Sequence, residues 1–300
     1  MKETVGVALG GGAARALAHV GALGALETRG LAPQMVAGTS YGAFIAALYA
    51  AGHSAAVIGE LMCAINMTRF WSCALELGWH QASFFWGRRF RRWLDETFFQ
   101  GRTFAELELP LAVACTDTRN GELVVLREGP VARAVSASCA LPGILGSVRC
   151  SVGCQERWLV DGGLVATVPF SALEDSGVTL RIGLHAGVRT EASRSVSALR
   201  RWHGSRAGQE LYRRLLACPG ESVWASSVRG LACVQASYEQ TITAPPGARL
   251  ISTNPPLQWW DFHKVEVALS AGRAATLAAL DSWGYTETVR ASSTPESLLR

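Results

Sequence analysis

The order of features in the first 52 residues constrains the fold of this chain more than any other part of its sequence. Residues 4–9 (TVGVAL) are a short apolar run that ends in three glycines, and apolar residues then recur at helical spacing from Ala14 to Gly30. A second short run, QMVAG, leads through a tight turn into a helix of small residues that ends at Gly52. This order of strand, glycine loop, helix, strand, turn and helix predicts an α/β fold with a mainly parallel central sheet.

The remaining sequence predicts more elements of the same kind, and we expect one domain over residues 1–290. Its core would comprise about residues 4–185 plus 248–282. Residues 190–245 are rich in Ser, Arg and Trp, which predicts peripheral helices that could form a lid, and residues 291–300 predict a flexible tail. The further elements expected are strands within 110–117, 121–126, 157–163, 178–187 and 248–253, and helices from about Pro130 and over about 262–282.

The composition is typical of a folded globular protein with a large core, since 49% of the residues are hydrophobic and 17% are charged. The net charge of +4 is mild and no nucleic-acid motif accompanies it, so we expect no nucleic-acid partner. The N-terminus lacks the pattern of a secretory signal, and no apolar stretch reaches the roughly 18 to 20 residues that span a bilayer. We therefore expect a soluble, cytoplasmic protein, and leave its oligomeric state open.

The eight cysteines are scattered singly, so we expect most of them to be buried as small hydrophobic side chains. Cys150 and Cys154 are close in sequence, but no Cys-x-x-Cys or paired histidine motif accompanies them. We therefore expect no metal site.

Ser40 stands at the centre of Gly38-Thr39-Ser40-Tyr41-Gly42, where the second strand turns into the second helix. Such a turn strains the serine, so the residues two before and two after it must be small, as Gly38 and Gly42 are. The helix that follows points its positive end at the site, which favours an anionic intermediate. The pattern indicates a nucleophile elbow, and an ordinary tight turn is the alternative.

The glycine loop at residues 10–12 indicates a second part of such a site. Backbone N–H groups freed by glycines at a strand-to-helix turn form a cradle for a phosphate or for an oxyanion. The dinucleotide-binding fingerprint fails, because Arg15 occupies the place of its last glycine or alanine, and no P-loop sequence is present. We therefore favour an oxyanion hole over a nucleotide-binding loop.

Asp161 in LVDGGLVATVP is the best candidate for a base that activates Ser40. A carboxylate at a strand end, beside Gly162 and Gly163, can reach a nucleophile on a neighbouring strand, and a poorly solvated Asp can accept the serine proton. The alternative is a simple hairpin turn, since Asp-Gly is a strong turn signal.

A Ser-Asp-His triad is the rival arrangement, with His185 or His263 as the base. An α/β-hydrolase usually places its serine after several strands, whereas Ser40 follows only about two. We expect both histidines to be packed or hydrogen-bonded in structural roles, and His19 on the first helix to brace the glycine loop.

At these residues the sequence resembles the patatin-like phospholipase family, and its short bacterial members in particular. The likeness runs in order over about residues 4–185, through ALGGGAARALAHVGALGAL, VAGTSYGAFIAALYAAG, LAVACTDTRNGELVVLREG, AVSASCALPGIL and WLVDGG. The resemblance implies a three-layer α/β/α fold and a serine lipid acyl hydrolase, of the phospholipase A or carboxylesterase type, that works through an acyl-enzyme without a metal or organic cofactor. It makes Ser40 the nucleophile and Asp161 the base. The oxyanion N–H groups would come from the loop of Gly10, Gly11, Gly12, Ala13 and Arg15.

Two positions depart from the family pattern. Ala16 replaces a common glycine after the loop arginine, and a methyl group there would cost about 1 kcal/mol or more if the position needs a positive φ. Thr167 replaces the usual asparagine after the Asp-Gly-Gly turn. These departures sustain an alternative function, a catalytically weak regulatory or binding protein with the same fold.

Two stretches that mix aromatic and basic residues, 84–99 and 199–216, could bring the protein into transient contact with a membrane surface, which would place it on the inner membrane. A lipid or small ester would then be the substrate. The alternative for the first stretch is an ordinary amphipathic helix with solvated arginines. Its packed face would comprise Phe90, Leu94, Thr97 and Phe98.

Overall fold

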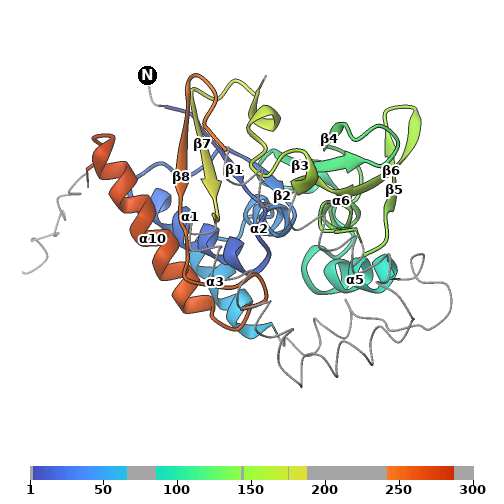
Figure 1. Ribbon diagram of the computed structural model, residues 1–300, viewed down its shortest axis with the longest axis horizontal. Coiled ribbons are helices and arrows are strands. Elements are labelled where there is room, and N and C mark those ends of the chain that lie inside the picture. Colours follow the sequence, from blue (N-terminus) through green and yellow to red (C-terminus); the bar gives the residue numbers. More distant parts are fainter. Residues whose placement is uncertain (1–2, 66–85, 143–144, 175, 188–241, 287–300) are drawn as a thin grey trace, which may run out of the picture.

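A computed structural model of the chain shows a single β-sheet flanked by helices (Figure 1). The predicted tail at 291–300 and the predicted peripheral segment at 190–245, apart from its last residues, lie outside the described residues. The residues that the structure describes are 3–65, 86–142, 145–174, 176–187 and 242–286.

Within the described residues, eight strands form one mixed sheet in the order β5-β6-β3-β2-β1-β7-β8, and β4 pairs with β3. The five strands from β3 to β8 along this order run parallel, whereas β4, β5 and β6 join by antiparallel pairing. The predicted α/β fold is therefore confirmed. The strands are β1 (Val5–Leu9), β2 (Met35–Thr39), β3 (Leu111–Asp117), β4 (Leu123–Leu126), β5 (Val148–Val152), β6 (Gln155–Asp161), β7 (Leu180–His185) and β8 (Ala248–Ser252).

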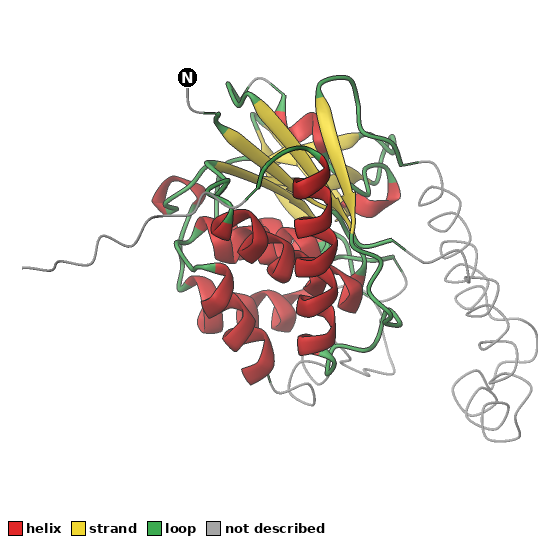
Figure 2. Ribbon diagram, turned by 90° about the vertical axis from the view of Figure 1, so that its left-hand side faces the viewer, coloured by secondary structure: helices red, strands yellow, loops and turns green. Residues whose placement is uncertain are grey.

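Most of the helices gather on one side of the sheet (Figure 2). The α-helices of the described residues are α1 (Ala18–Thr28), α2 (Tyr41–Ala50), α3 (Ala55–Ala64), α5 (Trp86–Leu94), α6 (Val131–Ser138) and α10 (Val265–Ser282). The same residues also form short 3-10 helices and a π-helical turn, namely η1 (Ala13–Leu17), η2 (Asp95–Phe99, the π turn), η3 (Phe104–Glu106), η4 (Gly162–Leu164) and η5 (Phe170–Leu173). None of the described helices is long and apolar enough to cross a bilayer.

Both faces of the sheet are buried, which explains why its central strands read as nearly continuous apolar runs. Successive side chains of a strand point to opposite faces. On β1, Val7 and Leu9 pack into the large core beneath the helices, whereas Ala8 packs into a smaller core on the other face. In the described part of the chain, that second face is covered by η5 and the residues just before it. The buried members of the smaller core are Ala8, Met35, Ala37, Ala112, Val168, Phe170, Ala172 and Leu173.

Of the α-helices and strands that the structure describes, two were not predicted from the sequence. Helix α3 begins after Ser54, whose side chain accepts a hydrogen bond from the N–H of Val57, so an N-cap signal was present. Strand β5 carries only two buried residues, Val148 and Cys150, separated by exposed ones. Such a short alternation gives a weak periodic signal, so this strand depends on its pairing with β6.

The amphipathic helix predicted over 84–99 is α5 followed by η2 in its described part, and its buried face differs from the prediction. Thr97 is exposed, whereas Trp93 and Phe99 are buried. The wider π turn at η2 shifts the angular position of every later side chain, so the regular helical spacing does not hold beyond Leu94. The corrected face packs against α6 and the Phe44 ring of α2.

Candidate active site

Ser40 occupies a strained turn between β2 and α2. Its backbone has φ 55° and ψ −130°, a conformation that costs a non-glycine residue about 1 to 3 kcal/mol. The turn closes tightly, because a Cβ atom on Gly38 would lie 2.4 Å from the Cα atom of Ala43. A Cβ atom on Gly42 would lie 2.4 Å from the carbonyl oxygen of Gly10. Both flanking glycines are therefore required by contact with neighbouring backbone.

The strand registers bring Ser40 and Asp161 to the same level of the sheet. Thr39 of β2 pairs with Ala114 of β3, so Ser40 stands level with Cys115, and Cys115 pairs with Asp161 of β6. The hydroxyl of Ser40 donates a hydrogen bond of 2.7 Å to Oδ2 of Asp161. Residues that lie 121 positions apart in the sequence thus meet through β3, which lies between their strands.

The Asp161 carboxylate is buried, with 2% of the residue exposed. Its Oδ1 atom accepts a 2.7 Å hydrogen bond from the N–H of Gly163. Burial raises the pKa of Asp161 to about 6, against the opposing effect of the hydrogen bonds from Ser40 and Gly163. A carboxylate with this pKa is ionised at neutral pH and is more basic than an ordinary aspartate, so it can accept a proton from Ser40.

Ser138 supports the elbow and was missed by the sequence analysis. Its Oγ atom accepts a 2.8 Å hydrogen bond from the N–H of Ser40 and donates one of 2.6 Å to the carbonyl oxygen of Ala114. The side chain is fully buried at the end of α6. A serine among the small residues of AVSAS carries no signal of its own, because the contact depends on how α6 packs over β3.

The glycine loop lies beside the elbow, since a Cβ atom on Gly11 would lie 3.4 Å from the Cβ atom of Ser40. The N–H of Gly10 donates a 2.9 Å hydrogen bond to the carbonyl oxygen of Leu184. The N–H of Gly11 donates one of the same length to the carbonyl oxygen of Thr167. These two N–H groups hold the loop against the sheet and are not free for an oxyanion.

The loop residues that follow differ in their hydrogen bonding. The N–H of Ala14 donates to the carbonyl oxygen of Trp259 (3.0 Å), and that of Arg15 donates to the carbonyl oxygen of Gly12 (3.1 Å). Within the described residues, the N–H groups of Gly12 and Ala13 have no hydrogen-bond partner. Both residues have positive φ angles, 150° and 50°. Of the predicted oxyanion positions, these two are the ones with unused N–H groups.

None of the three histidines considered as a base or a brace contacts the proposed dyad by a hydrogen bond. His19 is buried and its Nε2 atom lies 2.9 Å from the carbonyl oxygen of Gly10, so it braces the glycine loop as predicted. Burial lowers the pKa of His19 to about 4, and burial together with the Arg15 charge lowers that of His185 to about 4. His263 is exposed, so of the two roles expected for it, packed or hydrogen-bonded, the packed one does not hold. No histidine within the described residues forms a hydrogen bond to Ser40 or Asp161.

Ala16 and Thr167, the two departures from the family pattern, differ in their local structure. Ala16 is buried within η1 and is not among the positive-φ residues, so the φ strain considered for its methyl group does not arise. Thr167 contributes its backbone carbonyl to the N–H of Gly11. Any residue at position 167 could supply that carbonyl.

The described residues contain no group of three or more His, Cys, Asp or Glu side chains arranged to hold a metal ion. Cys115 and Cys150 are buried as expected, and Cys139 is half-buried. Cys63 and Cys154 are exposed, and the other three cysteines lie outside the described residues.

Known proteins resemble this chain in sequence, and a solved structure resembles it in fold. A family model described as "Patatin-like phospholipase" matches residues 7–174, which include the glycine loop, Ser40 and Asp161. "Patatin-like phospholipase domain-containing protein 6" of Homo sapiens is 32% identical over 198 residues, which are 64% of this chain and 14% of that protein. "Lysophospholipase NTE1" of Pyricularia oryzae is 32% identical over 187 residues, which are 62% of this chain and 12% of that protein. The match therefore spans a small part of these curated relatives.

Among solved structures, VipD from Legionella pneumophila has a similar fold. The comparison gives a TM-score of 0.56 at 16% sequence identity and covers 94% of this chain and 67% of that one. At this level of identity the likeness concerns the fold alone.

Proposed function

The chain belongs to the patatin-like phospholipase family, and from this premise we propose that it is a serine lipid acyl hydrolase with Ser40 as nucleophile and Asp161 as base. The observation that carries the proposal is the 2.7 Å hydrogen bond from the Ser40 hydroxyl to the buried Asp161 carboxylate. A nucleophile hydrogen-bonded to a base is the general requirement for covalent acyl transfer. Here the base is a carboxylate whose pKa is raised toward neutrality by burial.

In the acylation step, Oγ of Ser40 forms a bond to the carbonyl carbon of an ester while its proton passes to Asp161. The tetrahedral intermediate then collapses, the bond to the leaving alkoxide breaks, and Asp161 returns the proton to that oxygen. In deacylation, water attacks the acyl carbon and gives its proton to Asp161, and the proton passes back to Ser40 as the acid departs. Protons and charges balance over the cycle without a cofactor.

The negative charge on the tetrahedral intermediate needs hydrogen-bond donors already in position. The unused N–H groups of Gly12 and Ala13, in the loop beside Ser40, are the donors we propose. The N-terminus of α2 adds its positive dipole end directly after Ser40. Loss of one such donor typically costs about 10²- to 10³-fold in turnover.

We propose an acyl lipid or a smaller carboxylic ester as the substrate. The names of two matched relatives include "phospholipase" and "Lysophospholipase", which supports a glycerophospholipid or lysophospholipid with an ester-linked acyl chain. We also propose that the protein is cytoplasmic and lies at the inner membrane surface.

Contact with a lipid surface is supported by two exposed tryptophans beside the glycine loop. Trp259 and Trp260 are 46% and 42% exposed, and the Trp259 carbonyl accepts the N–H of Ala14. Indole rings favour the boundary between water and lipid. Replacing both with serine should reduce hydrolysis of vesicle lipid more than hydrolysis of a soluble short-chain ester. Equal losses on the two substrates would contradict this role. The second basic and aromatic stretch, 199–216, lies outside the described residues.

The test of the proposal is covalent labelling by a fluorophosphonate, followed by peptide mapping. Wild-type protein should take up one equivalent on Ser40, and Ser40→Ala should take up none. Asp161→Asn should label far more slowly, because the amide cannot accept the serine proton. A folded wild-type protein that does not label would contradict the proposed dyad and favour the regulatory or binding alternative.

A further inference from the structure

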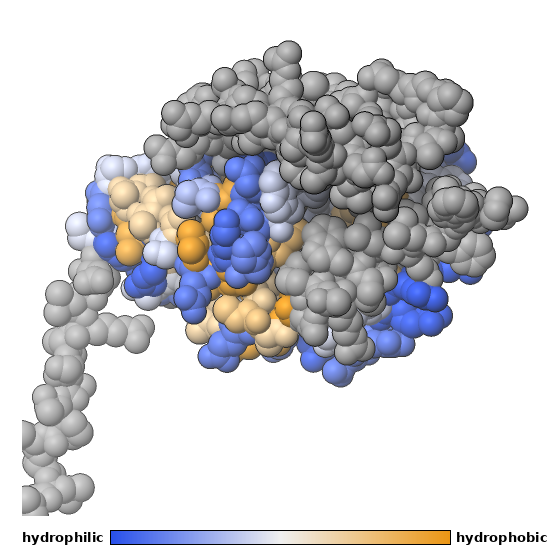
Figure 3. Space-filling model, turned by 60° about the horizontal axis from the view of Figure 1, so that its bottom comes forward, coloured by the Kyte–Doolittle hydropathy of each residue, from blue (hydrophilic) through white to orange (hydrophobic). Residues whose placement is uncertain are grey.

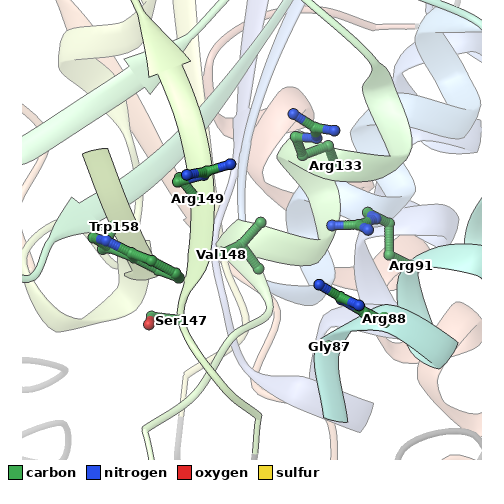
Figure 4. Close-up of a pocket in the computed structure, with 8 residues that line it drawn as sticks. All are labelled: Gly87, Arg88, Arg91, Arg133, Ser147, Val148, Arg149 and Trp158. Carbon is green, nitrogen blue, oxygen red and sulfur yellow. The ribbon is translucent and has the colours of Figure 1, made fainter. Parts of the chain in front are cut away.

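A pocket lies between α5, α6 and β5 (Figure 4). It has a volume of about 450 Å³, and none of the described residues that line it belongs to the proposed active site. Its walls include four arginines from three separate elements, together with one aliphatic and one aromatic side chain. We call it the arginine pocket and define it by Arg88, Arg91, Arg133, Arg149, Val148 and Trp158.

The arginines approach the pocket from two sides. Arg88 and Arg91 lie one turn apart on α5, and Arg133 lies near the start of α6. Arg149 lies on β5, and its guanidinium group extends toward the helices, while that of Arg91 extends toward Val148 (Figure 4). The four cations therefore surround one space.

Few negative charges oppose them. Among the described residues that line the pocket there is no carboxylate. Nε of Arg149 lies 3.3 Å from Oε2 of Glu156, and this pair is exposed. Within the described residues, no ion pair forms to Arg88, Arg91 or Arg133. The Asp95 carboxylate attracts Arg91 less strongly than Arg133 and Arg88 repel it. The Oδ1 atom of Asp95 also accepts a hydrogen bond from the N–H of Gly101.

This concentration of positive charge opposes folding. Partial burial, followed by repulsion from Arg133 and Arg88, lowers the pKa of the Arg91 guanidinium. Like charges held together without partners destabilise a protein. A bound anion would reverse that cost, because it would pair with several of them at once.

From this geometry we propose that the arginine pocket binds a phosphomonoester group. Guanidinium groups bind phosphate oxygens through paired N–H donors. Arginines on two sides of a space match a tetrahedral phosphate, whose terminal oxygens point in several directions, better than a planar carboxylate. The Trp158 ring and Val148 provide an apolar wall for the organic group that the phosphate carries. A volume of about 450 Å³ lies in the range of small-molecule sites and exceeds the needs of a bare phosphate ion.

The test is calorimetric titration of the full chain with glycerol 3-phosphate, with glycerol as the uncharged comparison. We expect saturable binding of the phosphate compound alone. Arg133→Gln and Arg149→Gln, from opposite walls, should each weaken it by about tenfold or more, since each removes a charge-assisted contact. Arg92→Gln is the matched control, because it removes the same charge from an exposed position on α5 outside the pocket. All three variants should hydrolyse a soluble ester at the wild-type rate.

Vesicles distinguish a soluble phosphomonoester from a lipid headgroup. Co-sedimentation with phosphatidylcholine vesicles is compared with and without phosphatidic acid, in the Ser40→Ala background to prevent turnover. Binding that requires phosphatidic acid and is lost with Arg133→Gln, but kept with Arg92→Gln, assigns the pocket to a headgroup. Binding of glycerol 3-phosphate without such vesicle binding assigns it to a soluble ligand. Absence of both, or equal losses in Arg92→Gln and the pocket variants, would overturn the proposal.

Discussion

The Ser40 site and the arginine pocket differ in the burial and the hydrogen bonding of their charged groups. At the first, a single carboxylate is buried, and each of its oxygens accepts a hydrogen bond from within the fold. At the second, four guanidinium groups border an open space that the described residues leave short of carboxylates. The first site raises the proton affinity of one group by removing water, whereas the second accumulates charge where water still screens it.

The difference indicates what each region is suited to do. A buried carboxylate that accepts hydrogen bonds and lies next to a serine is suited to proton transfer, so conservative substitutions there should affect turnover strongly. Exposed or partly buried arginines with few partners are suited to bind a ligand, so changes there should affect binding and leave turnover unaltered. Helix α6 contributes to both regions, with Arg133 near its start and Ser138 at its end.

The largest expected effect comes from Asp161→Asn. The amide keeps the size of the side chain but removes the proton acceptor, so kcat/KM for a soluble ester should fall by about 10³-fold. Arg133→Gln should leave this value within about twofold of wild type, because no step of the reaction uses the arginine pocket. A comparable loss in both variants would remove the distinction between the two regions.

Gly42→Ala should produce the next largest effect, on stability. Its Cβ atom would lie 2.4 Å from the carbonyl oxygen of Gly10 and 2.5 Å from that of Leu9, both backbone atoms that cannot move aside. We expect the free energy of unfolding to fall by about 3 kcal/mol, measured by urea denaturation. The control is Gly121→Ala, an exposed turn position at positive φ where no atom lies within 4 Å of the added Cβ, which should cost only about 1 kcal/mol. Equal losses would show that the elbow is not tightly packed.

The pH dependence should show the raised pKa of Asp161 in two measurements. Activity should rise with pH through about 6, because the base acts as a carboxylate. The contribution of Asp161 to stability should fall over the same window, from about pH 4 to about 6, because the folded state holds the proton more tightly than the unfolded state does. The total change is about 3 kcal/mol.

The measurement is the difference in unfolding free energy between wild type and Asp161→Asn across this window. The difference is needed because it cancels the contribution of His19 to stability, which changes with pH in the opposite direction. Its folded pKa of about 4 lies below the usual 6.5, so its contribution rises with pH between those values. A difference that does not vary with pH would contradict the raised pKa of Asp161.

Ser138→Ala should have a smaller effect. The variant leaves the Ser40 N–H and the Ala114 carbonyl without their shared partner, which we expect to cost about 1 to 3 kcal/mol of stability. Turnover should fall while KM changes little, because the nucleophile moves and the substrate contacts remain. Ser136→Ala on the same helix, a buried serine whose hydroxyl has no hydrogen-bond partner among the described residues, is the control. A similar loss in turnover for both variants would assign the effect to helix packing.

Ala16→Gly should have the smallest effect. Because Ala16 lies within η1 and not at positive φ, glycine gives no relief of strain and loosens the helix by less than about 1 kcal/mol. Esterase activity should change by less than about threefold. A large gain in activity would show that the methyl group disturbs the oxyanion loop, and would support the weak-enzyme alternative.

Local sequence patterns were sufficient to predict much of the fold. The strand and helix order of residues 4–52 could be read from short apolar runs and glycines, and Gly30 lies at φ 72° where a helix end was expected. The serine elbow and the Asp-Gly-Gly turn were also visible as sequence patterns, because each depends on the conformational limits of a few adjacent residues. The register that sets Ser40 level with Asp161 was not visible, since it depends on both strands pairing with β3.

The sequence alone therefore determined the fold class and identified Ser40 and Asp161 as the candidates for the proposed dyad. Only the tertiary structure decided which loop N–H groups are unused. Three of the other loop N–H groups bind the carbonyl oxygens of Leu184, Thr167 and Trp259, which come from distant parts of the chain. The tertiary structure also brought Ser138 beneath the elbow and gathered arginines from α5, α6 and β5 around one pocket. The physical reason is the same in each case: conformational preferences act along the chain, whereas hydrogen bonding, burial and charge act through space.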